Sequence, residues 1–313
     1  MKMLDRYKGA VLGHLIADSL GAPHTIKDAQ DIPIDLELVD YLDAVTNTQA
    51  PSGHPTDDGS QLICLGESLV TAGFDPEVQY DYYLRWFRNG FATRLRKAIG
   101  YGGQTARLFR NHDQLDVDRM RTSDPKIKGS GGLMRTLAIP LYYRTDSIDL
   151  VINKAKVATA VTHNNDEVML YSAVYSVLIA LILQGQSKQE ALVELESIFE
   201  REELVTSIFQ KDLPSMETEG RKKILKISDD FFTARSTLIT ALWAWQTTNN
   251  YADAVVKAIK VGVNTDTFGA VTGGLAGATN GVGDIPQRWL EGLLMKKRLV
   301  KLAANLYGKS LSK

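Results

Sequence analysis

The chain has 313 residues, 44% of them hydrophobic and 23% charged, a composition typical of a globular protein with a sizeable core. Its 36 basic and 37 acidic residues leave a net charge of −1, which gives no electrostatic signal for binding nucleic acid or an anionic membrane. The single cysteine, Cys64, excludes a disulfide framework and a cysteine zinc site, and we expect it to be a small buried hydrophobic residue.

The N-terminal segment, residues 1–22, has the basic residues and the apolar run of a signal peptide only in part. Asp5, His14 and Asp18 interrupt the run, which is too short to span a bilayer. The apolar period favours a helix that begins near residue 4, and we expect a cytoplasmic protein. Small residues recur at every fourth position of this helix: Gly9, Gly13, Ala17 and Gly21.

Helical patterns dominate the rest of the chain. Residues 166–185 are apolar on nearly every face and predict a buried central helix that ends at Gly185. Residues 187–209 open with an S-x-x-E capping box and predict an amphipathic helix. Further helices are expected over 233–248, 252–262 and 286–308.

Strand signals are scarce: residues 34–45 alternate weakly, and Pro140 interrupts residues 137–144. No repeat or linker divides the chain. The sequence therefore predicts one compact all-α, multi-helix domain over residues 1–313.

Two carboxylates stand side by side in PTDDGSQL, residues 55–62. An apolar helical run follows Thr56, Asp57 and Asp58. Helix capping alone would explain these residues, because their side-chain oxygens can accept hydrogen bonds from the free backbone N–H groups at a helix start. A second group, Asn264, Thr265, Asp266 and Thr267, also precedes a helix and allows the same explanation. Hard divalent cations choose such oxygen ligands, so the two clusters together also suggest a two-metal site.

The helix after Asp266 contains an unusual number of glycines. Each interior glycine costs about 1 kcal/mol relative to alanine, so another backbone must approach it closely. The glycines of the first helix are the expected partners, which would bring the two helix starts together. The glycines concerned are Gly269, Gly273 and Gly277.

Two other stretches offer binding groups. Gly129, Ser130, Gly131 and Gly132 are expected to open a helix with free N–H groups, where a phosphate could bind, although a simple loop would have the same composition. His163 lies on a polar turn before the central helix, as a cap or a ligand contact.

Taken in order, these motifs resemble those of the ADP-ribosylglycohydrolases, including the dinitrogenase-reductase-activating and ADP-ribosylarginine hydrolases. The matching blocks run from about residue 7 to 295: GAVLGHLIADSLGAP, PTDDGSQL, GGQTARL, GSGGLMRTLAIPL, VTHNNDE, LITALWAW, VGVNTDTFGAVTGGLAGATNG and IPQRWLEGL.

The resemblance implies a Mg²⁺-dependent hydrolase that cleaves the bond between ADP-ribose and a protein side chain, most often arginine. It implies one or two Mg²⁺ ions, with Mn²⁺ as an alternative. Asp57 and Asp58 are the implied catalytic residues. The implied metal ligands are Thr56, Asp57, Asp58, Asp266, Thr267 and, more weakly, Asn264. The implied contacts to ADP-ribose are Ser130, Gly131, Gly132 and His163.

Several positions depart from the family pattern. Thr25 stands where a glutamate usually follows GAP, preceded by His24, which could replace that glutamate as an acid or base. Asn264 replaces an aspartate, and Gly59 replaces a threonine. An acidic residue usual before G-x-Q-T is missing at Gly100 and Tyr101. Because affinity for divalent ions tracks ligand charge, we expect one intact metal site and one weakened site.

Two functions remain open from the sequence. The first is the hydrolase, acting on an ADP-ribosylated protein or a small ADP-ribosyl compound, as a monomer or small homo-oligomer and without nucleic acid or membrane partners. The second is a catalytically weakened relative that binds ADP-ribose or has a structural, crystallin-like role, which the substitutions at Thr25 and Asn264 favour.

Overall fold

Helices form nearly all of the regular structure. The computed structural model describes residues 1–25, 41–43, 49–220, 222, 224 and 231–312. Within these ranges no strand forms, and a single isolated β-bridge joins Gly129 to Thr233. The predicted all-α class is confirmed. The weakly alternating residues 34–45 lie largely outside the described residues.

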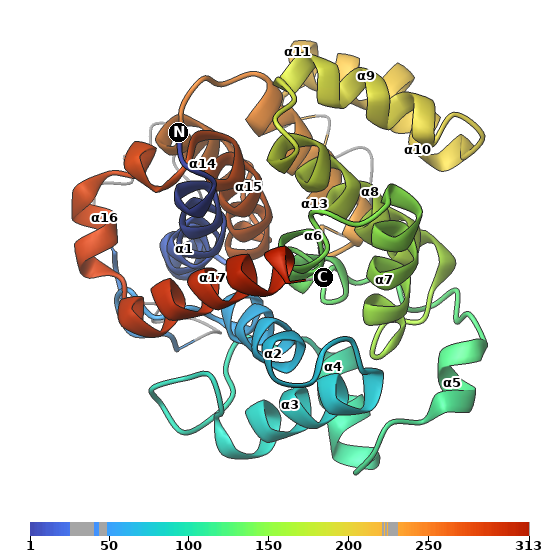
Figure 1. The fold of residues 1–313 in the computed structure, drawn as a ribbon, viewed down its shortest axis with the longest axis vertical. Coiled ribbons are helices and arrows are strands. Elements are labelled where there is room, and N and C mark those ends of the chain that lie inside the picture. Colours follow the sequence, from blue (N-terminus) through green and yellow to red (C-terminus); the bar gives the residue numbers. More distant parts are fainter. Residues whose placement is uncertain (26–40, 44–48, 221, 223, 225–230, 313) are drawn as a thin grey trace.

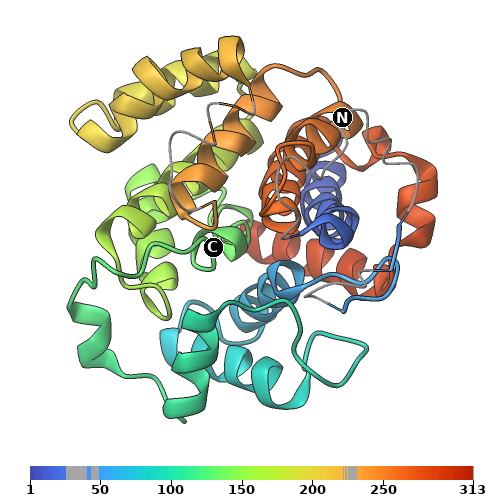
Figure 2. The same cartoon turned by 180° about the vertical axis from the view of Figure 1, so that it is seen from behind.

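The first helix and a helix from near the C-terminus pair at the centre of the fold. Helix α1 (Met3–Gly21) lies beside α15 (Thr265–Asn280) in both opposite views (Figures 1 and 2). The predicted glycine pairing is confirmed. A Cβ on Gly277 would lie 2.0 Å from the carbonyl oxygen of Gly9, and one on Gly273 would lie 2.5 Å from that of Gly13. Only glycine allows this approach of the two backbones.

Other helices surround this pair. Helices α14 (Tyr251–Ile259), α13 (Ala234–Gln246), α17 (Lys296–Leu311), α8 (Asp166–Leu183) and α2 (Asp57–Ala72) all contact α1 or α15. Helix α3 (Pro76–Asn89) packs against α2, and α7 (Ile148–Ala160) against α8. The predicted helices at 233–248 and 252–262 are thus present, each with slightly shifted ends.

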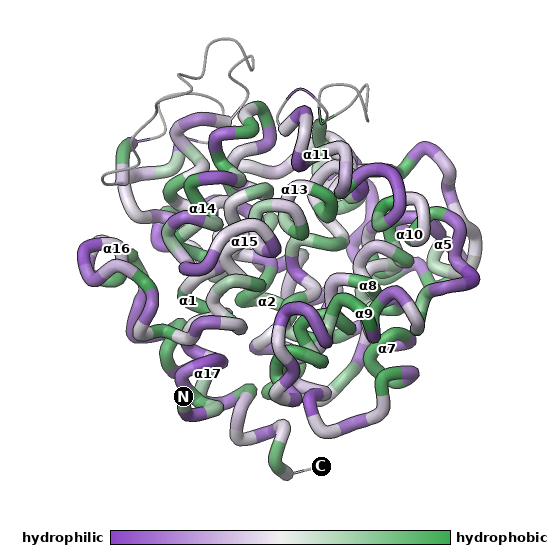
Figure 3. The backbone as a smooth tube through the Cα atoms, turned by 90° about the horizontal axis from the view of Figure 1, so that it is seen from above, coloured by the Kyte–Doolittle hydropathy of each residue, from purple (hydrophilic) through white to green (hydrophobic). Residues whose placement is uncertain are grey.

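Helix α8 is the predicted central helix, and its tube in Figure 3 is largely hydrophobic. Asn165 caps its start, and Gly185, with φ of +104°, follows its end. In the described part of the chain, α8 alone is long and apolar enough to cross a membrane by length and composition. However, 83% of that stretch is buried inside the fold, as expected for a core helix.

Two predicted helices are interrupted, and this corrects the sequence analysis. Residues 187–209 keep the predicted Ser187–Glu190 capping box but divide into α9 (Lys188–Ile198) and α10 (Glu203–Ser207), with buried Phe199 at the break. Residues 286–308 divide into α16 (Gln287–Gly292) and α17, because the Leu294 N–H donates to the Gly53 carbonyl instead of continuing the helix.

The remaining elements are shorter. They are η1 (Ala22–His24), α4 (Gly103–Asn111), α5 (Val117–Arg121), η3 (Leu133–Arg135), α6 (Ala138–Tyr142), η4 (Ile208–Asp212), α11 (Leu213–Glu219) and η5 (Val282–Asp284). Cys64 is fully buried in α2, as predicted, and burial raises the pKa of its thiol.

Candidate active site

The starts of α2 and α15 meet. The Thr267 hydroxyl donates to Asp58 Oδ2 at 3.3 Å, although the two residues are 209 positions apart. Asp57, Asp58 and Asp266 are all less than 10% exposed. The close pairing of α1 with α15 holds the second cluster in place, since Gly21 at the end of α1 accepts a hydrogen bond from the Thr265 hydroxyl at 2.7 Å. The expected convergence of the two helix starts is therefore observed.

A cavity of about 660 Å³ opens over this meeting point. It brings together most of the residues selected from the sequence. Its lining includes Asp57, Asp58, Asn264, Asp266, Thr267, Ser130, Gly131 and His163. Thr56 and Gly132 lie behind the lining: Thr56 is fully buried, and a Cβ on Gly132 would lie 2.6 Å from Thr159 Cγ2. Gly132 thus serves close packing against α7.

Asp18 is a central residue that the sequence analysis did not select. Asp18 lies in α1 and is fully buried. Its carboxylate accepts hydrogen bonds from the Thr56 N–H at 2.9 Å, the Thr56 hydroxyl at 2.8 Å and the Gly59 N–H at 2.9 Å. Thr56 in turn caps α2 by accepting the Asp58 N–H. The predicted capping role is therefore present, and Asp18 fixes the turn that presents Asp57 and Asp58.

Four carboxylates share this small buried volume, and the electrostatic consequence is large. Burial, reinforced by the charge of Asp266, raises the pKa of Asp18 to about 8. Burial also raises the pKa of Asp266 to about 6, a rise that hydrogen bonds from the Thr267 N–H and the Thr25 side chain oppose. The pKa values of Asp57 and Asp58 are raised well above the ordinary range by burial and by the neighbouring carboxylates.

The glycine-rich turn differs from its prediction. It leads into the three-residue η3 rather than a long helix, and the Ser130 N–H is not free, because it donates to the Phe232 carbonyl at 2.9 Å. Ser130 and Gly131 still line the cavity. An anion would therefore meet the Ser130 hydroxyl and the amides that follow it, instead of four free N–H groups.

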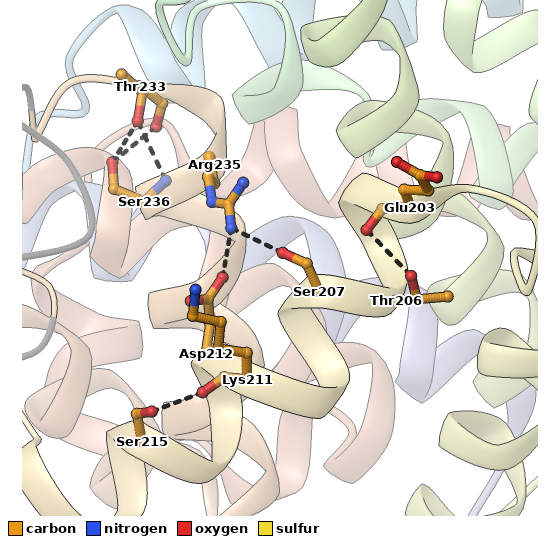
Figure 4. A network of polar contacts seen from close by, with 9 residues as sticks. All are labelled: Glu203, Thr206, Ser207, Lys211, Asp212, Ser215, Thr233, Arg235 and Ser236. Carbon is orange, nitrogen blue, oxygen red and sulfur yellow. Dashed lines mark hydrogen bonds and ion pairs between the residues drawn. The ribbon is translucent and has the colours of Figure 1, made fainter.

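The segment that binds this turn is itself anchored. Thr233 pairs with Gly129 and caps α13 through the Ser236 N–H. Two residues along, Arg235 donates to Asp212 Oδ2 at 2.6 Å and to the Ser207 hydroxyl at 3.0 Å (Figure 4). The network thus joins the outer α10–η4 segment to the start of α13, and so indirectly steadies the cavity wall.

His163 follows α7 and faces the same turn. A Cβ on Gly131 would lie 2.9 Å from His163 Nε2, so any residue larger than glycine at position 131 would collide with the imidazole. On its other side, His163 Nδ1 lies 2.8 Å from the Thr162 hydroxyl. The ring therefore has one nitrogen beside the cavity-lining turn and one beside the protein interior.

Comparisons with known proteins agree with this geometry. The family model described as ADP-ribosylglycohydrolase matches residues 1–313. The chain belongs to the ADP-ribosylglycohydrolase family. A solved structure titled ADP-ribosylglycohydrolase-related protein complex shares 31% identity and a TM-score of 0.77, covering 99% of each chain.

Family relatives whose names state an activity are more distant. ADP-ribosylarginine hydrolase Tri1 of Pseudomonas putida is 27% identical over 98% of this chain and 79% of its own length. ADP-ribosyl-[dinitrogen reductase] glycohydrolase of Rhodospirillum rubrum is 24% identical over 93% and 91%. ADP-ribosylhydrolase ARH3 of Bos taurus is 23% identical over 92% and 88%.

The structure accounts for two departures from the family pattern. A Cβ on Gly59 would lie 2.7 Å from Pro55 Cβ and 2.8 Å from Leu15 Cγ, so this site has no room for the usual threonine. Gly100 has a φ of +83°, and a Cβ there would lie 2.8 Å from Asp57 Oδ1. A carboxylate at position 100 would strain the backbone and approach Asp57.

The other departures place neutral side chains beside Asp266 in the cavity wall. The Thr25 and Thr265 hydroxyls lie 3.1 Å apart, and Asn264 lines the wall beside them. The Asn264 side-chain amide nitrogen is buried and has no hydrogen-bond partner among the described residues. His24 is buried and is not among the residues that line the cavity. The structure therefore does not support the prediction that His24 replaces the missing glutamate as an acid or base.

The oxygen donors present are of the kind that hold a hard cation. Among the described residues, Asp58 Oδ1 is buried and accepts no hydrogen bond, and no basic side chain forms an ion pair with the neighbouring carboxylates. The carboxylates therefore repel one another, and a bound cation would reduce this repulsion. Among the described residues, no three His, Cys, Asp or Glu side chains are placed to hold an ion by themselves. The threonine hydroxyls and water would have to complete the coordination.

Proposed function

We propose that this protein is a Mg²⁺-dependent hydrolase that cleaves the glycosidic bond of ADP-ribose attached to a protein side chain, of the arginine type, or to a related compound. The observation that carries the proposal is the buried cluster of Asp57, Asp58 and Asp266 at the base of a cavity large enough for a nucleotide-sized ligand. Membership of the family and the activities in its relatives' names support it.

The metal would be held by Asp58, Asp266 and Thr267, with Asp57 beside them and Thr56 as a further candidate. When bound, Mg²⁺ would supply positive charge to orient ribose hydroxyls and water. The chain's own residues do the rest. Asp18 fixes the position of Asp57 and Asp58 by holding the turn before α2. Asp58, with its unpartnered Oδ1, is placed to accept a proton from the attacking water.

The test is the release of ADP-ribose from ADP-ribosylated arginine, measured by chromatography with and without Mg²⁺. We expect release by the wild-type protein only with the ion, and none by Asp58→Asn. Ser68→Ala, which removes a buried hydroxyl farther along α2, is the matched control and should retain activity. Absence of release by a wild-type protein that ADP-ribose stabilises against heat would refute the hydrolase proposal.

That same result would support the second candidate function, binding of ADP-ribose without efficient turnover. Thr25 and Asn264 are the observation that favours it, because they remove negative charge from one side of the site. The release assay separates the two functions, since both a hydrolase and a binder are stabilised by ADP-ribose but only the hydrolase cleaves the arginine conjugate.

A further inference from the structure

Arg135 lies fully buried behind the site, and the mechanism above does not use it. It belongs to η3, immediately after the glycine-rich turn, and is 0% exposed. Its guanidinium carbon lies 4.4 Å from the centre of the Tyr83 ring. No carboxylate among the described residues forms an ion pair with it. A cation is costly to bury in this way, so its hydrogen bonds require an explanation.

The guanidinium connects the two halves of the cavity wall. Arg135 Nη1 donates to Gln61 Oε1 at 2.7 Å, one turn along α2 from Asp57 and Asp58. Arg135 Nη2 donates to the Thr162 hydroxyl at 2.5 Å. The Thr162 hydroxyl lies 2.8 Å from His163 Nδ1. A continuous chain of polar contacts therefore runs from α2, through Arg135 and Thr162, to the histidine of the cavity.

The direction of the hydrogen bonds in this series of polar contacts follows from the donors. An arginine can only donate, so the Thr162 oxygen accepts from a cation. That makes the hydroxyl a stronger donor and a poorer acceptor for a second N–H. In the arrangement that suits this order of donors, the hydroxyl hydrogen is directed to His163 Nδ1, which is then unprotonated. The ring proton is left on Nε2, the nitrogen beside the Gly131 turn.

We propose that Arg135 and Thr162 are positioning residues that fix His163 in the tautomer with the proton on Nε2. His163 then donates a hydrogen bond to an oxygen of the ligand in the cavity, a phosphate or ribose oxygen of ADP-ribose. The identity of the ligand rests on the proposed function, whereas the tautomer does not.

The tautomer can be read directly by NMR on protein carrying ¹⁵N-labelled histidine. The chain has five histidines, and the spectrum of His163→Gln identifies the signals of His163. We expect the wild-type spectrum to show a protonated Nε2 and an unprotonated Nδ1. Thr162→Val should mix the tautomers, while Thr162→Ser should restore the wild-type pattern. A proton on Nδ1 in the wild type, or an unchanged tautomer in Thr162→Val, would overturn the inference.

Calorimetric titration with ADP-ribose adds the functional readout. Thr162→Val should raise the Kd about tenfold, the equivalent of one charge-assisted hydrogen bond, and Thr162→Ser should stay within about twofold. Thr240→Val is the matched control, because it removes a buried threonine hydroxyl that has no hydrogen-bond partner in the described part of the chain. It should change neither the tautomer nor the Kd. If the wild-type protein binds no ADP-ribose, the proposed function fails, and the NMR result still decides whether Arg135 and Thr162 fix the tautomer of His163.

Discussion

The close pairing of α1 with α15 leads to a stability prediction for Gly277→Ala. In an exposed helix this substitution would add about 1 kcal/mol of stability. Here the new Cβ would lie 2.0 Å from the Gly9 carbonyl oxygen, whereas ordinary contact begins at 3.4 Å. Because the obstructing atom belongs to the backbone, the helices would have to separate. Overpacking of this kind costs about 3 kcal/mol, so we expect a net loss of about 2 kcal/mol or more.

The assay is urea denaturation followed by circular dichroism, compared with Gly308→Ala. Gly308 lies inside α17, and a Cβ there would meet no atom within 4 Å. This control should therefore gain up to about 1 kcal/mol from helix propensity alone. If Gly277→Ala gained as much as Gly308→Ala, the two backbones would not be in contact and the account of the fold's centre would be wrong.

Three further predictions concern the carboxylates. Without divalent ions, the raised pKa values of Asp18 and Asp266 mean that the folded protein binds more protons than the unfolded chain. The free energy of unfolding, measured in buffered urea, should therefore be highest below about pH 4 and fall as the pH rises to about 8. A free energy of unfolding that does not change over this pH range would contradict the raised pKa values of the buried carboxylates. Asp58→Asn should raise the ion-free melting temperature and abolish stabilisation by Mg²⁺, whereas a lower ion-free melting temperature would contradict the predicted repulsion. Asn264→Asp should tighten calorimetric Mn²⁺ affinity by about tenfold, and unchanged affinity and stoichiometry would contradict a weakened second site.

Much of the fold could be predicted because its signals are local. The capping box at Ser187 and the continuous apolar run of α8 are signals contained within one short segment each. The glycines of α15 were also informative, since their cost required a close backbone partner. The break at Phe199 could not be predicted, because no glycine or proline marks it. The second break follows Gly292, the last residue of α16, but a distant contact, that of Leu294 with Gly53, decides it.

The same division applies to the site. Asp57, Asp58 and Asp266 stand in short polar motifs at helix starts, so the sequence points to them. Asp18 stands in the middle of an apolar helical run, and its role depends on a turn 38 residues away. A single acidic residue that interrupts the apolar face of a buried helix was the signal available. Arg135 gave no such signal, because only the folded chain places it between Gln61 and Thr162.

The central claim is that helix starts from opposite ends of the chain form one cation site. The most direct measurement is anomalous diffraction from a crystal grown with Mn²⁺ and ADP-ribose. We predict a peak within coordination distance of the Asp58 and Asp266 carboxylates and the Thr267 hydroxyl, with the ribose beside it. A fully occupied ligand without a peak at these residues, or Mn²⁺ bound elsewhere, would contradict the account.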